Sequence, residues 1–79
     1  MIAIIDYGMG NLRSVEKAFE HLGFEARIFD DPAKTSLASH LVLPGDAAFG
    51  DAMNNLWQGG WVDCIHTHID AGRPFLGIC

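Results

Sequence analysis

The chain has 79 residues, of which 49% are hydrophobic, which suits one small folded domain and is too apolar for a disordered tail. Its formal net charge is −5 with only five lysines and arginines, which argues against a nucleic-acid-binding surface. No apolar stretch is long enough to span a bilayer, and Met1 leads directly into an apolar segment without a basic region. We therefore expect a cytoplasmic protein without a signal peptide or membrane anchor, and its two cysteines are expected to be free thiols.

The first third of the chain predicts a strand, a helix and a second strand. Residues 2–5 form a continuous apolar run, which is typical of a strand buried on both faces of a parallel sheet. The glycine-rich turn at residues 8–11 follows, and Asn11 is a suitable helix N-cap. Apolar residues then recur at helical spacing: Leu12, Val15, Ala18, Phe19 and Leu22. Gly23 is predicted to end this helix, and the alternating residues 24–28 are predicted to form the second strand.

The rest of the chain predicts two more strands separated by helices. Asp30-Asp31-Pro32 should end the second strand, and residues 33–39 support no more than one helical turn. A strand is expected at residues 40–43, where Pro44-Gly45 stops it, and a helix is expected around 48–56, before a break at Gly59-Gly60. The next helix carries a stripe of Val62, Ile65 and Ile69 and is closed by Gly72. A buried strand at 75–78 follows it.

Strands that alternate with helices at this spacing predict an α/β fold, with a parallel sheet, flanking helices and right-handed connections. Four strands would make a half-sized flavodoxin-like sheet within a single domain over residues 1–79. Ligands bind such sheets at the carboxyl ends of the strands. We therefore expect the chemistry where residues 7–11, residues 44–48 and the chain around Cys79 converge.

The last six residues, 74–79, combine a proline, an apolar run and a Gly-x-Cys ending. This pattern is typical of a strand that enters a nucleophile elbow, the tight turn that presents a reactive side chain at the top of a parallel sheet. Gly77, two residues before Cys79, leaves room for the chain to fold back over the strand. Cys79 is therefore the candidate nucleophile.

Three segments together resemble one family, the glutaminase subunits of imidazole glycerol phosphate synthase, which are class I glutamine amidotransferases. Residues 6–15, Asp-Tyr-Gly-Met-Gly-Asn-Leu-Arg-Ser-Val, resemble the family's first strand-to-helix turn, and this segment is the discriminating one. Residues 43–50, Leu-Pro-Gly-Asp-Ala-Ala-Phe-Gly, resemble its oxyanion strand. Residues 74–79 resemble the start of its Gly-x-Cys-x-Gly elbow. The resemblance covers the whole chain, but only the N-terminal portion of a family member.

The resemblance implies that a cysteine thiolate attacks the side-chain amide of glutamine and that the released ammonia passes to a (β/α)₈ synthase (cyclase) subunit in histidine biosynthesis. It makes Cys79 the nucleophile and gives the oxyanion and substrate-binding role to Gly45, Asp46 and Ala47. The turn carrying Gly8, Gly10 and Asn11 is expected to face the synthase partner. No cofactor and no metal are implied.

Two departures from the family pattern affect these expectations. The family usually has an apolar residue and then a glycine after Pro-Gly, where this chain has Asp46 and Ala47. Ala47 should make a peptide rotation at that point harder, because a positive φ is costly with a Cβ. The family's catalytic histidine and glutamate, and the second oxyanion amide, would lie beyond residue 79. We therefore expect these 79 residues alone to be inactive and to expose an apolar edge.

The sequence is also compatible with other interpretations. Cys79 can be a structural cysteine, in which case the chain is a non-catalytic α/β interaction module, and within the enzyme class another class I amidotransferase is the alternative. A dinucleotide site is disfavoured because the third glycine of its fingerprint is replaced by Arg13. A zinc site is disfavoured because His66 points away from the helix face that Cys64 and His68 share, so both histidines are expected to be solvated. Trp57 and Trp61 are expected to anchor packing.

Overall fold

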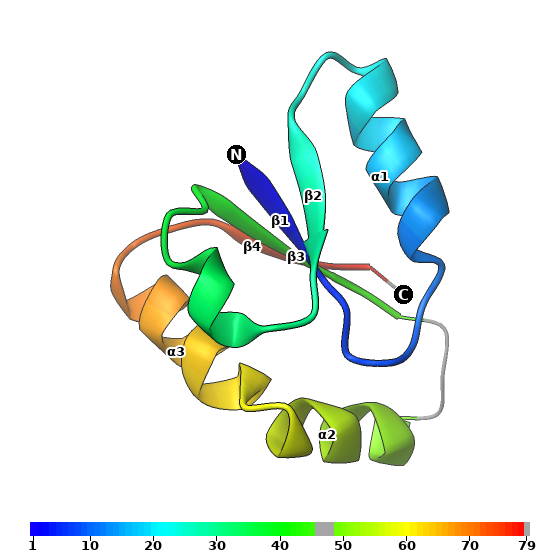
Figure 1. Ribbon diagram of the computed structural model, residues 1–79. Coiled ribbons are helices and arrows are strands. Elements are labelled where there is room, and N and C mark those ends of the chain that lie inside the picture. Colours follow the sequence, from blue (N-terminus) through cyan, green and yellow to red (C-terminus); the bar gives the residue numbers. More distant parts are fainter. Residues whose placement is uncertain (46–48, 79) are drawn as a thin grey trace.

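The computed structural model describes residues 1–45 and 49–78, and these form one four-stranded sheet with helices on both faces (Figure 1). The strands are β1 (Ile2–Ile5), β2 (Ala26–Phe29), β3 (His40–Pro44) and β4 (Phe75–Ile78), in the spatial order β2-β1-β3-β4. Every neighbouring pair is parallel. This order matches the flavodoxin-like doubly wound arrangement, so the predicted α/β fold with a parallel sheet is confirmed.

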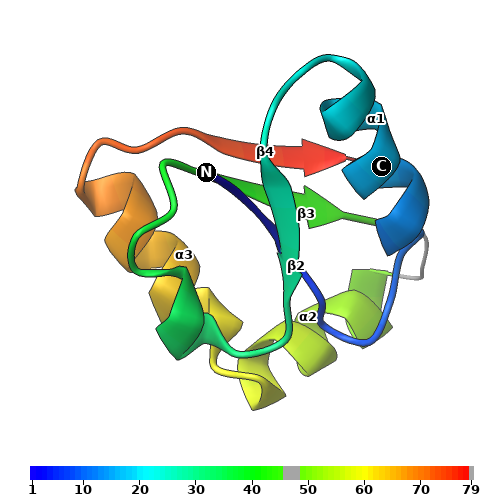
Figure 2. The ribbon, with the colours of Figure 1, turned by 45° about the horizontal axis from the view of Figure 1, so that its top comes forward.

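The helices divide between the two faces of the sheet. Helix α1 (Leu12–His21) covers one face, whereas α2 (Phe49–Gln58) and α3 (Trp61–Asp70) cover the other (Figures 1 and 2). A short 3₁₀ helix, η1 (Pro32–Thr35), joins β2 to β3. No helix within residues 1–45 and 49–78 combines the length and the apolar character that crossing a membrane requires.

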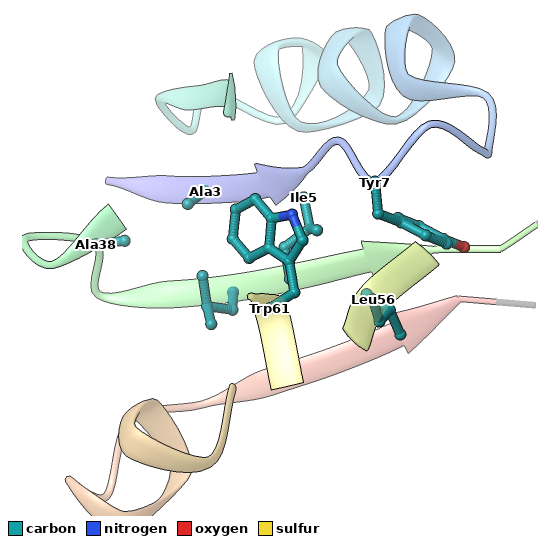
Figure 3. Close-up of a cluster of buried hydrophobic side chains, with 7 residues drawn as sticks. Ala3, Ile5, Tyr7, Ala38, Leu56 and Trp61 are labelled. Atoms are coloured by element: carbon teal, nitrogen blue, oxygen red, sulfur yellow. The ribbon is translucent and has the colours of Figure 1, made fainter. Parts of the chain in front are cut away.

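The central strand β1 is buried from both sides, as its apolar run predicts. Ala3, Ile4 and Ile5 have no exposed surface. Ile4 points to the α1 face, where it clusters with buried residues of the neighbouring strands. Ala3 and Ile5 point to the other face, toward Leu56 of α2 and Trp61 of α3 (Figure 3). Alternate residues of one strand therefore form the two halves of the core.

The ends of α1 also follow the sequence. The Asn11 side chain accepts a hydrogen bond from the backbone N–H of Ser14, with 3.5 Å between the two atoms, so Asn11 is the N-cap. Gly23 has a φ of +89°, the left-handed conformation expected of a residue that ends a helix. Both predictions are confirmed.

The second strand begins two residues later than predicted. The backbone N–H of Phe24 donates to the carbonyl of Phe19 at 3.0 Å, so residue 24 still belongs to the turn that ends α1. Glu25 accepts a hydrogen bond from the N–H of Ile2, but regular pairing with β1 starts at Ala26. The strand then runs on to Phe29.

The fourth strand is exposed rather than buried. Leu76 is 51% exposed and Ile78 is 38% exposed, whereas Phe75 packs partly against the core on the α3 side. The prediction of a buried strand is wrong because β4 lies at the edge of the sheet, where only β3 pairs with it in the described residues. The expected apolar edge is confirmed.

The buried face of helix α3 overlaps its predicted aliphatic stripe only in part, because Val62 and Ile65 pack against the core and Ile69 does not. Trp61 and His68 are buried, Val62 and Ile65 are half-buried, and Ile69 is 49% exposed. The His68 ring pairs through Nε2 with the carbonyl oxygen of Pro74 at 2.9 Å. The prediction of a solvated histidine is therefore wrong for His68, whereas His66 is exposed as expected. The burial of Trp61 agrees with an anchoring role, and Trp57 is exposed.

Candidate functional site at the carboxyl edge of the sheet

The carboxyl ends of the parallel strands meet at one edge of the sheet (Figure 2). A groove of about 450 Å³ lies at this edge, between α1 and the ends of β3 and β4. Its lining includes Asn11 from the first turn, Gly45 from the end of β3, and Ile78 from the end of β4. The register pairs Ile78 with Pro44, so these two strand ends lie side by side. The groove is therefore where the sequence motifs predict the chemistry.

The turn after β1 is built on two glycines with left-handed backbone. Gly8 has a φ of +87° and Gly10 a φ of +98°. The backbone N–H of Gly8 donates to the Asp6 carboxylate at 3.1 Å, which closes the start of the turn. A Cβ at Gly10 would lie 3.2 Å from both the Cβ and the carbonyl oxygen of Pro44. Gly10 is therefore required both for its conformation and for the close approach of the turn to the end of β3.

Tyr7 joins this turn to its surroundings. Its side chain is buried, with 7% exposed, and extends from the end of β1 toward β3 (Figure 3). The hydroxyl donates to the carbonyl oxygen of Pro44 at 2.5 Å. The backbone carbonyl of Tyr7 accepts a hydrogen bond from Nδ2 of Asn55 on α2 at 3.0 Å. One residue therefore holds the first turn, the end of β3 and α2 together.

Sequence reasoning did not select Tyr7 or Asn55 as site residues. The available signal was a single tyrosine placed directly after a buried strand in a glycine-rich turn. A buried tyrosine needs a partner for its hydroxyl, and the neighbouring strand end offers a carbonyl. Asn55 carries no comparable signal, because its partner is a backbone atom 48 positions away in the sequence.

The structure brings together four of the predicted site residues at this edge. Gly8, Gly10 and Asn11 lie in the first turn, and Gly45 follows the strand that Gly10 contacts. Asp46, Ala47 and Cys79 lie outside the described residues, and the roles predicted for them stay predictions. The described part of the site is thus a glycine turn packed on a Pro-Gly strand end.

Cys64 and His68, considered above for zinc, are engaged in other contacts near η1 and α3. Cys64 Sγ lies 3.3 Å from the hydroxyl oxygen of Thr35, and His68 pairs with Pro74. Within residues 1–45 and 49–78, no group of three or more histidine, cysteine, aspartate or glutamate side chains is arranged to hold a metal ion. These contacts give both side chains a structural role.

The chain is similar to several curated proteins that share one name. The chain is 61% identical to a protein of Syntrophotalea carbinolica called imidazole glycerol phosphate synthase subunit HisH, over 100% of this chain and 38% of that protein. Proteins of the same name from Geobacter metallireducens and Aquifex aeolicus are 63% and 57% identical, over 99% and 96% of this chain and 37% of each relative. No protein-family model matches the chain.

A solved structure shows the same fold. A crystal structure of a glutamine amidotransferase superimposes with a TM-score of 0.82 at 19% identity, over 100% of this chain and 42% of that chain. The resemblance carried by the three motifs is thus confirmed along all 79 residues. The chain spans a little over a third of the length of the relatives it matches.

Proposed function

We propose that these 79 residues are the N-terminal part of a single glutamine amidotransferase domain, the glutaminase subunit of imidazole glycerol phosphate synthase. The observation that carries the proposal is identity of 57–63% to three proteins of that name along nearly the whole chain. The proposal includes a role in histidine biosynthesis, a cytoplasmic location and a heterodimer with a (β/α)₈ synthase subunit that receives the ammonia.

The proposed reaction begins at Cys79. Its thiolate attacks the side-chain amide carbon of glutamine and forms a tetrahedral oxyanion. The carbon–nitrogen bond then breaks, the nitrogen takes up a proton and leaves as ammonia, and a glutamyl thioester remains on the sulfur. Water hydrolyses this thioester, which releases glutamate and restores the thiol. The nucleophile, the oxyanion donors and a general base have to converge on one point for these steps.

The described groove supports the oxyanion part of this mechanism. Gly45 lines it beside Ile78, the residue that precedes the proposed nucleophile. In the proposal, one backbone amide of the segment 45–47, around Gly45 and Asp46, donates to the developing oxyanion, and a missing donor of this kind typically costs about 3–4 kcal/mol of transition-state stabilisation. Gly8, Gly10 and Asn11 lie on the same edge and are assigned to the contact with the synthase subunit. The general base is assigned to the part of the relatives that lies outside the segment matched by this chain, which is 38% of the Syntrophotalea carbinolica protein.

Ammonia release from glutamine tests the proposal. The suitable protein is a chimera in which these 79 residues replace the matching segment of the Syntrophotalea carbinolica relative, 61% identical to them. We expect the chimera, mixed with its synthase subunit, to release ammonia from glutamine. Cys79→Ala should abolish the release, and Cys64→Ala should retain it, because Cys64 lies with Thr35 and outside the groove.

Three other results are informative. No release by the chimera, while the unmodified relative is active, would favour a non-catalytic α/β interaction module. Release that persists in Cys79→Ala would remove the nucleophile assignment. Release that supports a different synthase in place of the imidazole glycerol phosphate enzyme would favour another class I amidotransferase.

A further inference from the structure

We propose that Tyr7 is a positioning residue for Gly45, and that its hydroxyl sets the orientation of the Pro44–Gly45 peptide. The inference rests on the proposed function, because it deepens the role of the same site. It adds a residue that neither the motifs nor the names of the relatives assign.

The peptide bond between Pro44 and Gly45 is planar. The carbonyl of Pro44 and the N–H of Gly45 belong to one rigid plane and point in opposite directions. The Tyr7 hydroxyl donates to that carbonyl at 2.5 Å from a buried position. Fixing the carbonyl therefore fixes the direction of the Gly45 N–H and the point from which the following residues start.

Tyr7 is itself held in place by α2. Its backbone carbonyl accepts a hydrogen bond from Asn55 of α2, and a Cβ on the next residue, Gly8, would lie only 3.3 Å from the same Asn55 nitrogen. Helix α2 begins at Phe49. Tyr7 thus connects the chain before residues 46–48, through Pro44, to the helix that follows them.

The phenol is the part of Tyr7 that reaches Pro44. Gly10 of the same turn also approaches Pro44 closely, since a Cβ there would lie 3.2 Å from the Pro44 Cβ. Pro44 is buried and its hydrogen bond with Tyr7 is buried too, and an oriented donor there fixes a rotation that packing alone leaves free. Removing only the hydroxyl is therefore the informative change.

The test compares Tyr7→Phe with wild type in the chimera with its synthase subunit. We expect kcat for ammonia release to fall about tenfold with KM for glutamine nearly unchanged, because oxyanion donors act on the transition state more than on bound substrate. The Gly45 amide should exchange its hydrogen about fivefold faster, because the peptide it belongs to loses its anchor.

Thr35→Val is the matched control. The Thr35 hydroxyl is also buried and also donates to a proline carbonyl, that of Pro32, at 2.8 Å, but in η1 and outside the groove. Its loss should lower stability in a similar way while kcat and Gly45 exchange stay as in wild type. A purely structural role for Tyr7 would make the two variants behave alike.

The inference is overturned if Gly45 exchange in Tyr7→Phe equals that of wild type, or if kcat in Tyr7→Phe stays within twofold of wild type. It is also overturned if Thr35→Val lowers kcat equally. Failure of the proposed function looks different, because the wild-type chimera itself would then release no ammonia. In that case the hydrogen exchange of the Gly45 amide still decides whether the Tyr7 hydroxyl fixes the orientation of the Pro44–Gly45 peptide.

Discussion

At the scale of single residues, the site depends on a glycine that touches another strand. Gly10 and Gly23 both have left-handed backbone, with φ of +98° and +89°. A Cβ at Gly10 would meet Pro44 at 3.2 Å, whereas a Cβ at Gly23 has nothing within 4 Å. A side chain at either position therefore carries the same conformational cost, but only a side chain at Gly10 would also collide with Pro44.

Alanine substitutions separate these two effects. Gly23→Ala should lower the free energy of unfolding by about 1 kcal/mol, the usual cost of a left-handed alanine. Gly10→Ala should lower it by about 1–3 kcal/mol more, because the Pro44 backbone cannot move aside cheaply. Urea unfolding of both variants of the chimera measures the difference. Equal losses would show that the contact between the turn and Pro44 does not matter for stability.

At the scale of elements, the junction of α2 and α3 is closely packed around Trp61. A Cβ at Gly59 would lie 2.9 Å from Cδ1 of Trp61 and 3.2 Å from the carbonyl oxygen of Asn55. Trp61 is fully buried and is one of the largest side chains in the core. The two helices can therefore approach each other only with glycine at position 59.

Gly59→Ala should accordingly destabilise the protein by about 1–3 kcal/mol through overpacking against Trp61. Gly50→Ala is the control, because Gly50 lies in α2 with nothing within 4 Å of a Cβ. There the free energy of unfolding should stay constant or rise by up to about 1 kcal/mol, since alanine favours the helix. Thermal unfolding of the two variants of the chimera, followed by tryptophan fluorescence, would reveal the contrast, and matching midpoints would contradict it.

At the scale of the whole molecule, the edge strand β4 exposes apolar side chains. Leu76 and Ile78 of β4 are exposed on the face that α1 covers only in part, and a groove lined by Phe19, Val42 and Leu76 continues across it. Edge strands with exposed apolar side chains favour pairing with other molecules. We expect the 79-residue chain by itself to form dimers or larger species at micromolar concentration.

Sedimentation velocity of three proteins tests this expectation. The wild-type 79-residue chain should sediment as an associated species, and Leu76→Lys should shift it toward the monomer, because a charge on the edge opposes strand pairing. Leu37→Lys should leave the distribution unchanged, since Leu37 is exposed on the segment between η1 and β3 and not on the sheet edge. A wild-type chain that sediments as a monomer would contradict the account.

Sequence patterns correctly predicted the structural features that depend on residues close together in the chain. The apolar run of β1, the Asn11 cap and the Gly23 terminator are local patterns, and each is confirmed. The exposed apolar edge at β4 was expected, but the burial of His68 was missed, because it depends on a contact with Pro74 in the assembled structure. Tyr7 was missed for the same reason, since its hydroxyl bonds a carbonyl 37 residues away in the sequence.

The expected strand topology and the three motifs together located the candidate site more completely than the local patterns did. They placed the first turn and the Pro44-Gly45 strand end at one edge of the sheet, and the groove between α1, β3 and β4 lies there. They could not supply the hydrogen bonds that hold this edge together, because these run between β1, β3 and α2 through side chains and backbone atoms that no spacing pattern encodes.

The most direct test of the account is to find the glutamyl thioester. The chimera and its synthase subunit would be mixed with glutamine, quenched in acid during turnover, digested and analysed by mass spectrometry. A glutamyl adduct is expected on the peptide that contains Cys79 and none on the peptide that contains Cys64. An adduct on another residue, or ammonia release without any adduct on Cys79, would contradict it.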